Sequence, residues 1–371
     1  EIPFYPLNVQ KEFERVVINY FVDEYARGRT PNPCLECNRH VKFHHLIARA
    51  RYLGASFLAT GHYARIQQDE QGMFHLYEAA DDSKDQSYVL YMLSQEQLGY
   101  LLFPLGNLQK SEVREIAHVD SASMTLAEVD ELNAVIHEIL ADPGVDGIVV
   151  THGTDSMEET AMAVDVFHDD QRPVVFTGSQ KPSDHPEADG PNNLFEAMVV
   201  AMDASARGIG VLIVFGHAVL PVRGAVKWHT TDELGFATNA PEDPVRPTPL
   251  PLKELADVRV DIIPAHAGSD GAFVDAAIEA GAKGLVVEGM GAGNVGTAMA
   301  AAVGRALEAD IPVVMCTRVP RGDVHGTYGG AGGGATLAAR GVVGAGCVHA
   351  PQARIILAAA IASGAHPQTL F

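Results

Sequence analysis

The chain has 371 residues, of which 47% are hydrophobic, and this length predicts two or three domains with a sizeable core. Its 26 basic and 47 acidic residues give a formal net charge of −21, which argues against a nucleic-acid clamp spread over the whole surface. The sequence holds no run of 18 apolar residues and so predicts no membrane-spanning helix.

Cysteine usage indicates the redox compartment. Four cysteines, two of them in a CxxC pair, are too few for a disulfide framework and favour a reducing compartment, so we expect a cytoplasmic protein. The chain opens on Glu1 without a leader pattern, and we expect it to begin inside a longer gene product.

Composition changes sharply near residue 118. Residues 1–118 carry a net charge of −3, 16 of the 25 aromatic residues and 6 of the 36 glycines. Residues 119–371 carry a net charge of −18, 9 aromatic residues and 30 glycines. A change of this size indicates two sequences of different origin joined at that point. We therefore expect two lobes with few contacts between them.

The first segment contains a helical pattern and a motif rich in proline and cysteine. Apolar residues at helical spacing predict a helix over 9–26. The motif GRTPNPCLECN follows at 28–38, and its two prolines predict a rigid loop that carries both thiols ahead of a helix beginning near Lys42. A thiol near a helix N-terminus and near Arg39 has its thiolate form favoured, which predicts a nucleophile.

Two other interpretations of the cysteine pair stay open, half of a zinc site or a buried pair. Zinc needs two further ligands, and the sequence holds no second CxxC, although three histidines lie nearby, at His40, His44 and His45.

The motifs of residues 1–118 together resemble the tRNA-specific 2-thiouridylase family. The matching stretches are, in chain order, GRTPNPC-x-x-CN, VKF at 41–43, ATGHYAR at 59–65, KDQSY at 84–88 and FPLG at 103–106. The resemblance implies an ATP-dependent enzyme that adenylates the wobble uridine of certain tRNAs and delivers persulfide sulfur to it. It also implies that Cys37 is the nucleophilic cysteine and that Gly61 belongs to the ATP site.

Two further stretches match parts of the family that contact tRNA. Asn32, Pro33 and Cys34 match the stretch that touches the target base. Lys84, Asp85 and Gln86 match a tRNA-contacting segment, although Lys84 alone has the features of an ordinary surface lysine. The family's SGGVDS-type phosphate loop does not occur, and its second catalytic cysteine should follow FPLG, where this chain changes composition. The two remaining cysteines, Cys316 and Cys347, lie in the other segment.

After residue 118 the chain alternates short apolar runs with helical stretches. Thr125 to Glu128 predicts a capping box ahead of an amphipathic helix. The apolar runs predict buried strands at 147–150, 173–176, 211–214, 284–287 and 312–315. This alternation predicts parallel sheets in an α/β fold. Residues 240–252 hold five prolines and predict a connection between two domains, 119–243 and 253–371.

A polar cluster follows the first of these predicted strands. The stretch THGTDSMEET at 151–160 places Thr154 and Asp155 at the C-terminal end of that strand, where ligands bind in parallel sheets. The cluster also has a purely structural interpretation, because Ser156 and Glu159 have the spacing of a capping box.

The motifs of residues 119–371 together resemble bacterial type I/II L-asparaginase. They are DSASM at 120–124, THGTDSMEET, VVFTG at 174–178, ADGPNNL at 188–194, AVKWHTTD at 225–232, GMGAGN at 289–294 and TRVP at 317–320. The resemblance implies two α/β domains, a homotetramer built from intimate dimers, and no metal or organic cofactor.

Hydrolysis of a side-chain amide needs an activated hydroxyl group, since free threonine is a poor nucleophile at neutral pH. The resemblance implies that Thr154 positions the water or hydroxyl, with Lys227 as its partner, and that Asp155 holds the substrate's α-ammonium group. It also implies that Ser121 binds the α-carboxylate and that Asn294 reaches across a subunit interface. Lys227 can lower the pKa of a hydroxyl only where it is partly buried beside Asp155.

The primary nucleophile of that family, a threonine in a TGGTI-type motif, has no counterpart, because no TGGT occurs in this chain. The family's first strand is missing with it, which leaves a sheet edge open. We therefore expect an amidohydrolase for L-asparagine or a related small amide, fused to a fragment of a tRNA-thiolating enzyme, with both activities impaired. Two alternatives stay open: tRNA 2-thiolation as the main function, and a non-functional fusion or assembly artefact.

The predicted fold class is α/β. A remnant of an ATP-pyrophosphatase (Rossmann-like) domain at 1–118 is joined to a two-domain asparaginase-like fold that lacks its first strand. The partners expected are a small amide, tRNA through residues 1–118 and further copies of the chain in a dimer or tetramer. ATP is implied for the first segment alone, and neither a metal ion nor a membrane is expected.

Overall fold

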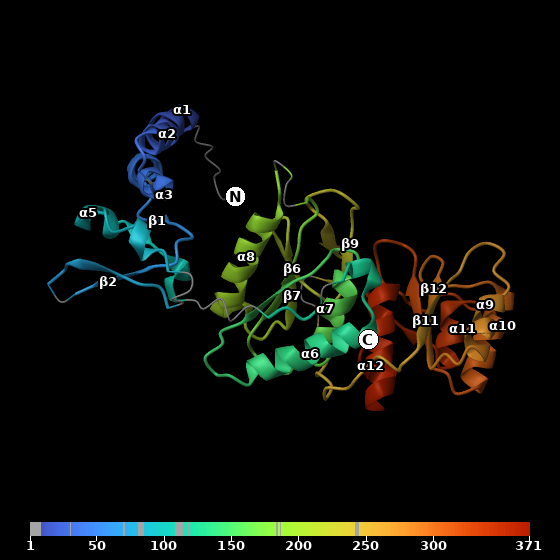
Figure 1. Cartoon of the computed structure of the whole chain (residues 1–371). Coiled ribbons are helices and arrows are strands. Elements are labelled where there is room, and N and C mark those ends of the chain that lie inside the picture. The colour runs from blue at the N-terminus through green and yellow to red at the C-terminus, as the bar shows by residue number, and fades with distance from the viewer. Residues whose placement is uncertain are drawn as a thin grey trace. The chain divides into compact units, whose positions relative to one another are not determined.

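The computed structural model describes all residues except 1–8, 30, 70, 81–84, 108–113, 118, 183–184, 186 and 242–244. The chain divides into two compact units, residues 1–115 and residues 116–371 (Figure 1). The predicted join at residue 118 itself lies outside the described residues.

The first unit begins with the predicted helix. Elements α1 (Gln10–Phe13), η1 (Glu14–Ile18) and α2 (Asn19–Ala26) follow one another without a break, which confirms the helix over 9–26. Its apolar face is poorly covered within this unit, because Val17 is buried whereas Phe21 is 38% exposed and Tyr25 is 67% exposed.

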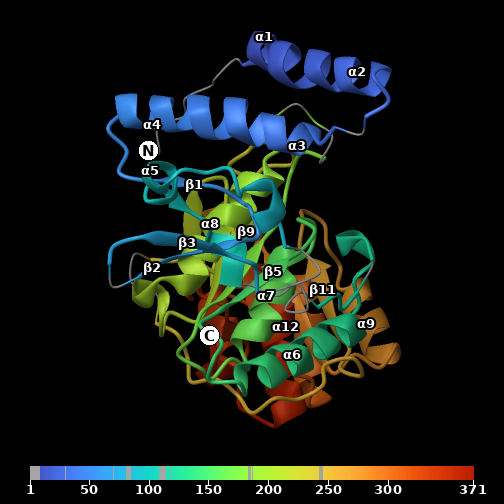
Figure 2. The ribbon, with the colours of Figure 1, turned by 60° about the vertical axis from the view of Figure 1, so that its left-hand side comes forward.

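The two motif cysteines lie in a helix, so the predicted loop was wrong. Elements α3 (Pro33–Glu36), η2 (Cys37–Leu46) and α4 (Ile47–Tyr52) are continuous (Figure 2). Pro33 takes the first helical position, where its missing N–H group is not needed and its fixed φ suits the helix. The Asn32 side chain caps this end by accepting a hydrogen bond from the backbone N–H of Cys34 at 3.0 Å.

Short strands and turns complete the first unit. Strand β1 (Leu58–Ala59) pairs in parallel with β4 (Leu101–Leu102), and β2 (Arg65–Gln68) pairs antiparallel with β3 (Phe74–Tyr77). The remaining helical elements are η3 (Ser87–Val89), α5 (Gln95–Leu98) and η4 (Pro104–Asn107). The main buried cluster of this unit is small and contains Phe43, Ile47, Ala64, Val89, Leu90 and Leu101.

The second unit opens with the predicted capped helix and a four-stranded sheet. The Thr125–Glu128 capping box is present at the start of α6 (Leu126–Leu140), behind η6 (Ser121–Ser123). Strands β5 (Ile148–Thr151), β6 (Val174–Thr177) and β7 (Val211–Phe215) are parallel, and β8 (Ala218–Pro221) runs antiparallel to β7. Strand β5 is an edge of this sheet within the described part of the chain, in line with the open edge that the sequence predicts.

Helices cover both faces of this first sheet (Figure 1). Alternate residues of β6 point to opposite faces: Val174 packs with α6 and α7 (Met157–Asp165), whereas Val175 packs with α8 (Gly190–Met202). Because both faces of the inner strands are covered, β6 and β7 are apolar runs without alternation. Element η7 (Ala204–Ala206) leads from α8 to β7.

A second sheet is parallel throughout, in the order β11 (Val260–Pro264), β12 (Gly284–Gly289), β13 (Val313–Thr317) and β14 (Val343–Gly344). One face is covered by α9 (Ala272–Glu279), α10 (Thr297–Glu308) and α11 (Gly334–Ala339). The other is covered by α12 (Ala350–Ser363), which is followed by η8 (Pro367–Thr369). The five strands predicted from apolar runs are thus confirmed, as is the parallel arrangement.

Helix α12 lies between the two sheets and joins them (Figure 1). It is apolar on all sides because it packs on β11–β13 and also on α7. Its buried Gln352 bonds backbone groups on the first-sheet side, accepting from Gly224 N at 3.0 Å and donating to Val222 O at 2.7 Å. A hairpin of β9 (Ala225–Lys227) and β10 (Phe236–Thr238) follows that contact. Residues 245–255 contain neither helix nor strand, as their prolines predict, while the domain boundaries at 243 and 253 stay predictions.

Candidate functional site

Three of the predicted site residues meet at the end of β5. Thr154 and Asp155 lie in the turn between β5 and α7, and Lys227 is the last residue of β9. The Nζ atom of Lys227 donates to Thr154 Oγ1 at 2.8 Å and to Asp155 Oδ1 at 2.6 Å. The Lys227 side chain is 20% exposed and that of Asp155 is 60% exposed, so the ammonium group is partly buried while the carboxylate reaches solvent.

Ser121 reaches the same turn from the segment before α6. Its Oγ atom accepts a hydrogen bond from the backbone N–H of Asp155 at 3.2 Å, and its carbonyl oxygen accepts one from the Ser156 hydroxyl at 2.6 Å. A Cβ atom at Gly153 would stand 2.5 Å from Ser121 Oγ, so glycine is needed there for this approach. The hydroxyl proton of Ser121 is left to donate to a ligand, since its oxygen serves as the acceptor from Asp155.

The capping-box interpretation of this cluster was wrong. Ser156 makes no side-chain cap at the start of α7, because its hydroxyl is committed to the Ser121 carbonyl oxygen. The Glu159 carboxylate instead forms an ion pair with Arg354 of α12 at 2.7 Å. Ser156 therefore bonds this turn to the segment before α6, and Glu159 bonds the start of α7 to α12.

Gln180 was missed by the sequence reasoning. Its Oε1 atom accepts the hydroxyl hydrogen of Thr154 at 3.2 Å, and its Nε2 donates to the backbone oxygens of His229 and Asp232, each at 3.2 Å. Gln180 follows the C-terminal end of β6, next to β5 in the sheet. That position, four residues beyond the apolar run at 173–176, is the signal by which it could have been found.

A buried carboxyl group lies beneath this cluster. Glu158 is on the first turn of α7, and its Oε2 atom has no hydrogen-bond partner among the described residues. Burial raises the pKa of Glu158 to about 7, against the smaller lowering effect of the Lys227 charge.

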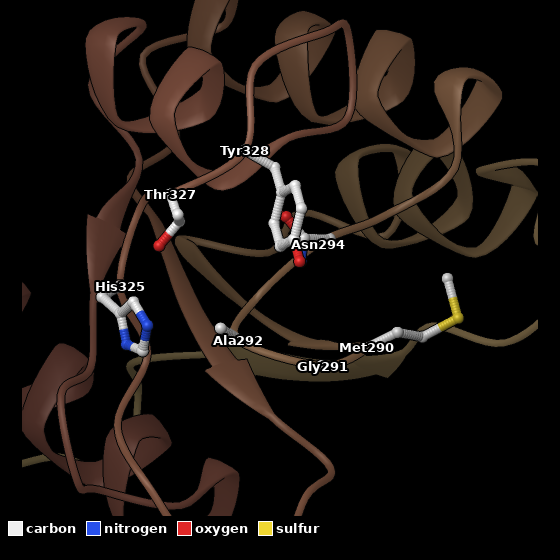
Figure 3. Close-up of a pocket in the computed structure, with 7 residues that line it drawn as sticks. All are labelled: Met290, Gly291, Ala292, Asn294, His325, Thr327 and Tyr328. Atoms are coloured by element: carbon white, nitrogen blue, oxygen red, sulfur yellow. The ribbon is translucent and has the colours of Figure 1, made fainter.

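Asn294 is not bonded to this cluster. Its Oδ1 accepts a hydrogen bond from Gly334 N at 3.1 Å, and it lines a hollow of about 510 Å³ at the end of the second sheet. Figure 3 shows the hollow between the segment from Met290 to Asn294 and the segment from His325 to Tyr328. Its role across a subunit interface stays a prediction.

In the first unit the predicted residues lie in two places. Cys34 is exposed and Cys37 is partly buried, and burial raises the pKa of the Cys37 thiol. The sequence pattern predicts a favoured thiolate for a thiol of this pair, and at Cys37 burial acts in the opposite direction, while the helix begins before this residue and the Arg39 charge is paired with Glu36 at 3.5 Å.

The second place is the turn after β1. The Gln86 backbone N–H donates to Tyr63 O at 2.8 Å and its Oε1 accepts from Tyr63 N at 3.0 Å, while Asp85 accepts from Ala79 N at 2.8 Å. Gly61 lies two residues before Tyr63, in the turn that follows β1. Lys84 lies outside the described residues. Internal bonds thus hold Asp85 and Gln86 in place.

Metal ligation finds no support in the described part of the chain, where no group of three or more histidine, cysteine or acidic side chains could hold a metal ion. The four cysteines are free thiols. Among the described helices, none is long and apolar enough to cross a membrane.

Comparison with known families gives three matches along the chain, the first two of which overlap. The family model for the tRNA methyl transferase HUP domain matches residues 1–133. The model for the N-terminal asparaginase domain matches residues 79–246, and that for the glutaminase/asparaginase C-terminal domain matches residues 259–370.

Relatives of the first segment are tRNA-specific 2-thiouridylases of the MnmA type. The protein of Geobacter metallireducens is 59% identical over 116 residues, which is 31% of this chain and 32% of that protein. That of Geotalea uraniireducens is 55% identical over 117 residues, which is 32% of this chain and 31% of that protein. The chain thus spans about a third of the length of these curated relatives.

The solved structure of a probable cytoplasmic L-asparaginase from Campylobacter jejuni is similar to most of the chain. It has a TM-score of 0.62 and 28% sequence identity, and the match covers 69% of this chain and 83% of that one. The predicted double resemblance is confirmed, and the fold is α/β with a HUP (Rossmann-like) first segment and two asparaginase domains.

Proposed function

Because the chain joins an MnmA-type segment to the two domains of an asparaginase, we propose that its second unit binds L-asparagine or a related small amide and hydrolyses it slowly. The observation that supports this proposal is the contact of Lys227 Nζ with both Thr154 and Asp155. The geometry meets the condition set by the sequence, that the lysine be partly buried beside that carboxylate.

The hydrogen bonds give each residue a distinct task. The Thr154 oxygen accepts from Lys227 and its proton points to Gln180, so the ammonium group orients the hydroxyl without taking its proton. The second oxygen of Asp155 suits an α-ammonium group, and the Ser121 hydroxyl suits an α-carboxylate.

Slow turnover follows from what surrounds Thr154. Within the described part of the chain, no second hydroxyl or thiol is hydrogen-bonded to Thr154 or Lys227, and no TGGT motif occurs in the sequence. Attack on the amide carbon therefore depends on Thr154 itself or on a water that it positions. Activation of the hydroxyl by a nearby base is incomplete in this arrangement.

The test measures binding and turnover separately. Titration of L-aspartate by calorimetry should show binding, and Lys227→Met should weaken it about tenfold or more through loss of a charged contact. Release of ammonia from L-asparagine, followed by NMR at high protein concentration, should be slow and should be abolished in the same variant. The exposed Lys253 provides a matched control, since Lys253→Met should change neither readout. Equal ammonia release by the unaltered protein and Lys227→Met would rule out the proposed site.

A second function, binding of tRNA by residues 1–118, is favoured by the 55–59% identity of that segment to MnmA proteins. We propose Cys37 as its nucleophile, residues 32–34 and 84–86 as its tRNA contacts, and Gly61 as part of an ATP site. A gel shift with unmodified tRNA should show binding that weakens as salt increases. Binding that is absent at low salt removes this function.

We further propose a cytoplasmic homo-oligomer whose two parts were joined by a fusion near residue 118. The family models overlap over residues 79–133, so the join falls where both families are still matched. A single long read of the genomic DNA across codon 118 tests the fusion, because an uninterrupted reading frame supports it and a frame break there identifies an assembly artefact.

A further inference from the structure

The hairpin that carries Lys227 is too short to hold its own position. Strands β9 and β10 pair over three residues each, with Lys227 opposite Phe236. A two-stranded hairpin of this length is marginal by itself and depends on its neighbours. On one side, Gln180 holds the backbone of the loop at His229 and Asp232.

Arg321 contacts the other side of the hairpin. It belongs to the segment after β13, in the C-terminal part of the second unit. Its guanidinium carbon lies 4.8 Å from the centre of the Trp228 ring, and its Nη1 atom donates to Thr238 O at 2.6 Å. Trp228 directly follows β9 and Thr238 ends β10, so one side chain contacts both strands of the hairpin.

The residues next to this contact reinforce it. Asn239 donates to Gly322 O at 3.1 Å and to Cys347 O at 3.0 Å, and it accepts from Gly322 N at 2.9 Å. Gly322 has a φ of +100°, a conformation that other residues rarely adopt. The turn at Gly322 therefore places the Arg321 side chain and the backbone groups that bond Asn239 against the same hairpin.

We propose that Arg321 is a positioning residue for Lys227, holding the β9–β10 hairpin so that Nζ stays bonded to Thr154 and Asp155. The inference rests on the proposed function for its biological meaning. It adds that the C-terminal sheet controls the lysine of a site built on the N-terminal sheet. Arg321 itself touches neither Thr154 nor Asp155 among the contacts of the described residues.

The direct measurement is the rate at which an amine-reactive reagent labels Lys227, read by mass spectrometry relative to the exposed Lys283. A paired ammonium group reacts slowly, so Arg321→Ala should raise the relative rate about three- to tenfold, the range expected for losing a cation–π contact and one hydrogen bond. Arg321→Lys keeps the cation and should restore most of the protection. Arg318→Ala, which changes an exposed arginine of the same segment, should leave the rate unchanged.

Two further readouts keep the inference testable. Trp228 is the only tryptophan of the chain, so its emission reports directly on the loss of the arginine in Arg321→Ala. Trp228→Leu serves as the test if Arg321→Ala does not fold. It removes the ring while leaving Arg321 in place, and it should raise Lys227 labelling by a similar factor. Altered Trp228 emission with Lys227 labelling at the original rate would overturn the proposal.

The labelling experiment tests the role of Arg321 independently of the proposed function. Labelling is measured without substrate, so a rise in Arg321→Ala supports the positioning role even if the unaltered protein binds no L-aspartate. That failure of binding would remove the proposed function alone.

Discussion

Glu158 combines burial with a carboxyl group that the proposed chemistry does not use. Burial raises its pKa from the ordinary glutamate value of 4.5 to about 7, so the folded state binds the proton more tightly than the unfolded state does. Stability of the second unit should therefore fall as pH rises from about 4.5 to about 7 and should level off above that. Glu158→Gln should remove this fall and stabilise the protein at pH 8 by on the order of 2 kcal/mol.

Denaturant unfolding at pH 5 and pH 8 measures this difference. Glu131 is an exposed carboxylate on α6, and Glu131→Gln serves as the control with an unaltered pH dependence. A Glu158→Gln variant with the same pH dependence as the original protein would show that Glu158 is not the group responsible.

The two cysteines of the CxxC pair should differ in reactivity. Burial raises the pKa of the Cys37 thiol, whereas Cys34 is exposed. Iodoacetamide at pH 7.5 should therefore alkylate Cys34 first, with Cys37 several-fold slower, because the thiolate is the reactive form. Peptide mass spectrometry over a time course gives both rates. Faster alkylation of Cys37 would restore the interpretation that the sequence alone favours.

Most residues of the candidate site in the second unit could be predicted from the sequence, and the residue that was missed has a physical explanation. Thr154, Asp155, Lys227 and Ser121 belong to recognisable motifs, and the structure brings them together. Gln180 belongs to no motif that the resemblance singled out, because its role depends on two parallel strands ending side by side.

At the scale of elements, helix α12 connects the two sheets of the second unit, because it packs on β11–β13 and on α7. The Gln352 amide is 1% exposed and satisfies Val222 O and Gly224 N, which lie just before β9. Gln352→Ala leaves Gly224 N without its partner, leaves Val222 O with the Ala225 N–H alone, and opens a cavity, so it should cost about 2–4 kcal/mol of stability. Urea unfolding of the second unit measures the loss. Gln368→Ala, in the exposed C-terminal turn, should change stability by less than about 0.5 kcal/mol.

The strands were predictable and one helix start was not, for a reason specific to proline. Apolar runs bounded by turns identify buried parallel strands, because inner strands with both faces covered need no alternation. Proline is excluded from helix interiors but is accepted at the first helical position. In the CxxC motif Pro33 occupies that position, so the helix begins at Pro33 and not near Lys42, where the prolines of the motif predict its start.

At the scale of the whole molecule, the division into two compact units predicts two unfolding transitions. The first unit has a small core, whose main cluster holds six buried apolar residues among those described, and it leaves much of its first helix exposed. The second unit has two sheets joined by α12 and a far larger core. The first unit should therefore unfold at lower temperature or denaturant concentration, since burial of apolar surface is the main stabilising contribution.

Ligands identify which transition belongs to which unit. L-aspartate at 100 times its dissociation constant should stabilise the second unit by about 2.7 kcal/mol and leave the first unchanged, because a ligand stabilises only the unit that binds it. Unmodified tRNA should act on the first unit alone. Hydrogen exchange with mass spectrometry resolves residues 31–107 from residues 119–371 in a single experiment. A common transition that both ligands shift equally would mean that the two units fold as one, and the fusion of two independent folds would then be the wrong description of this chain.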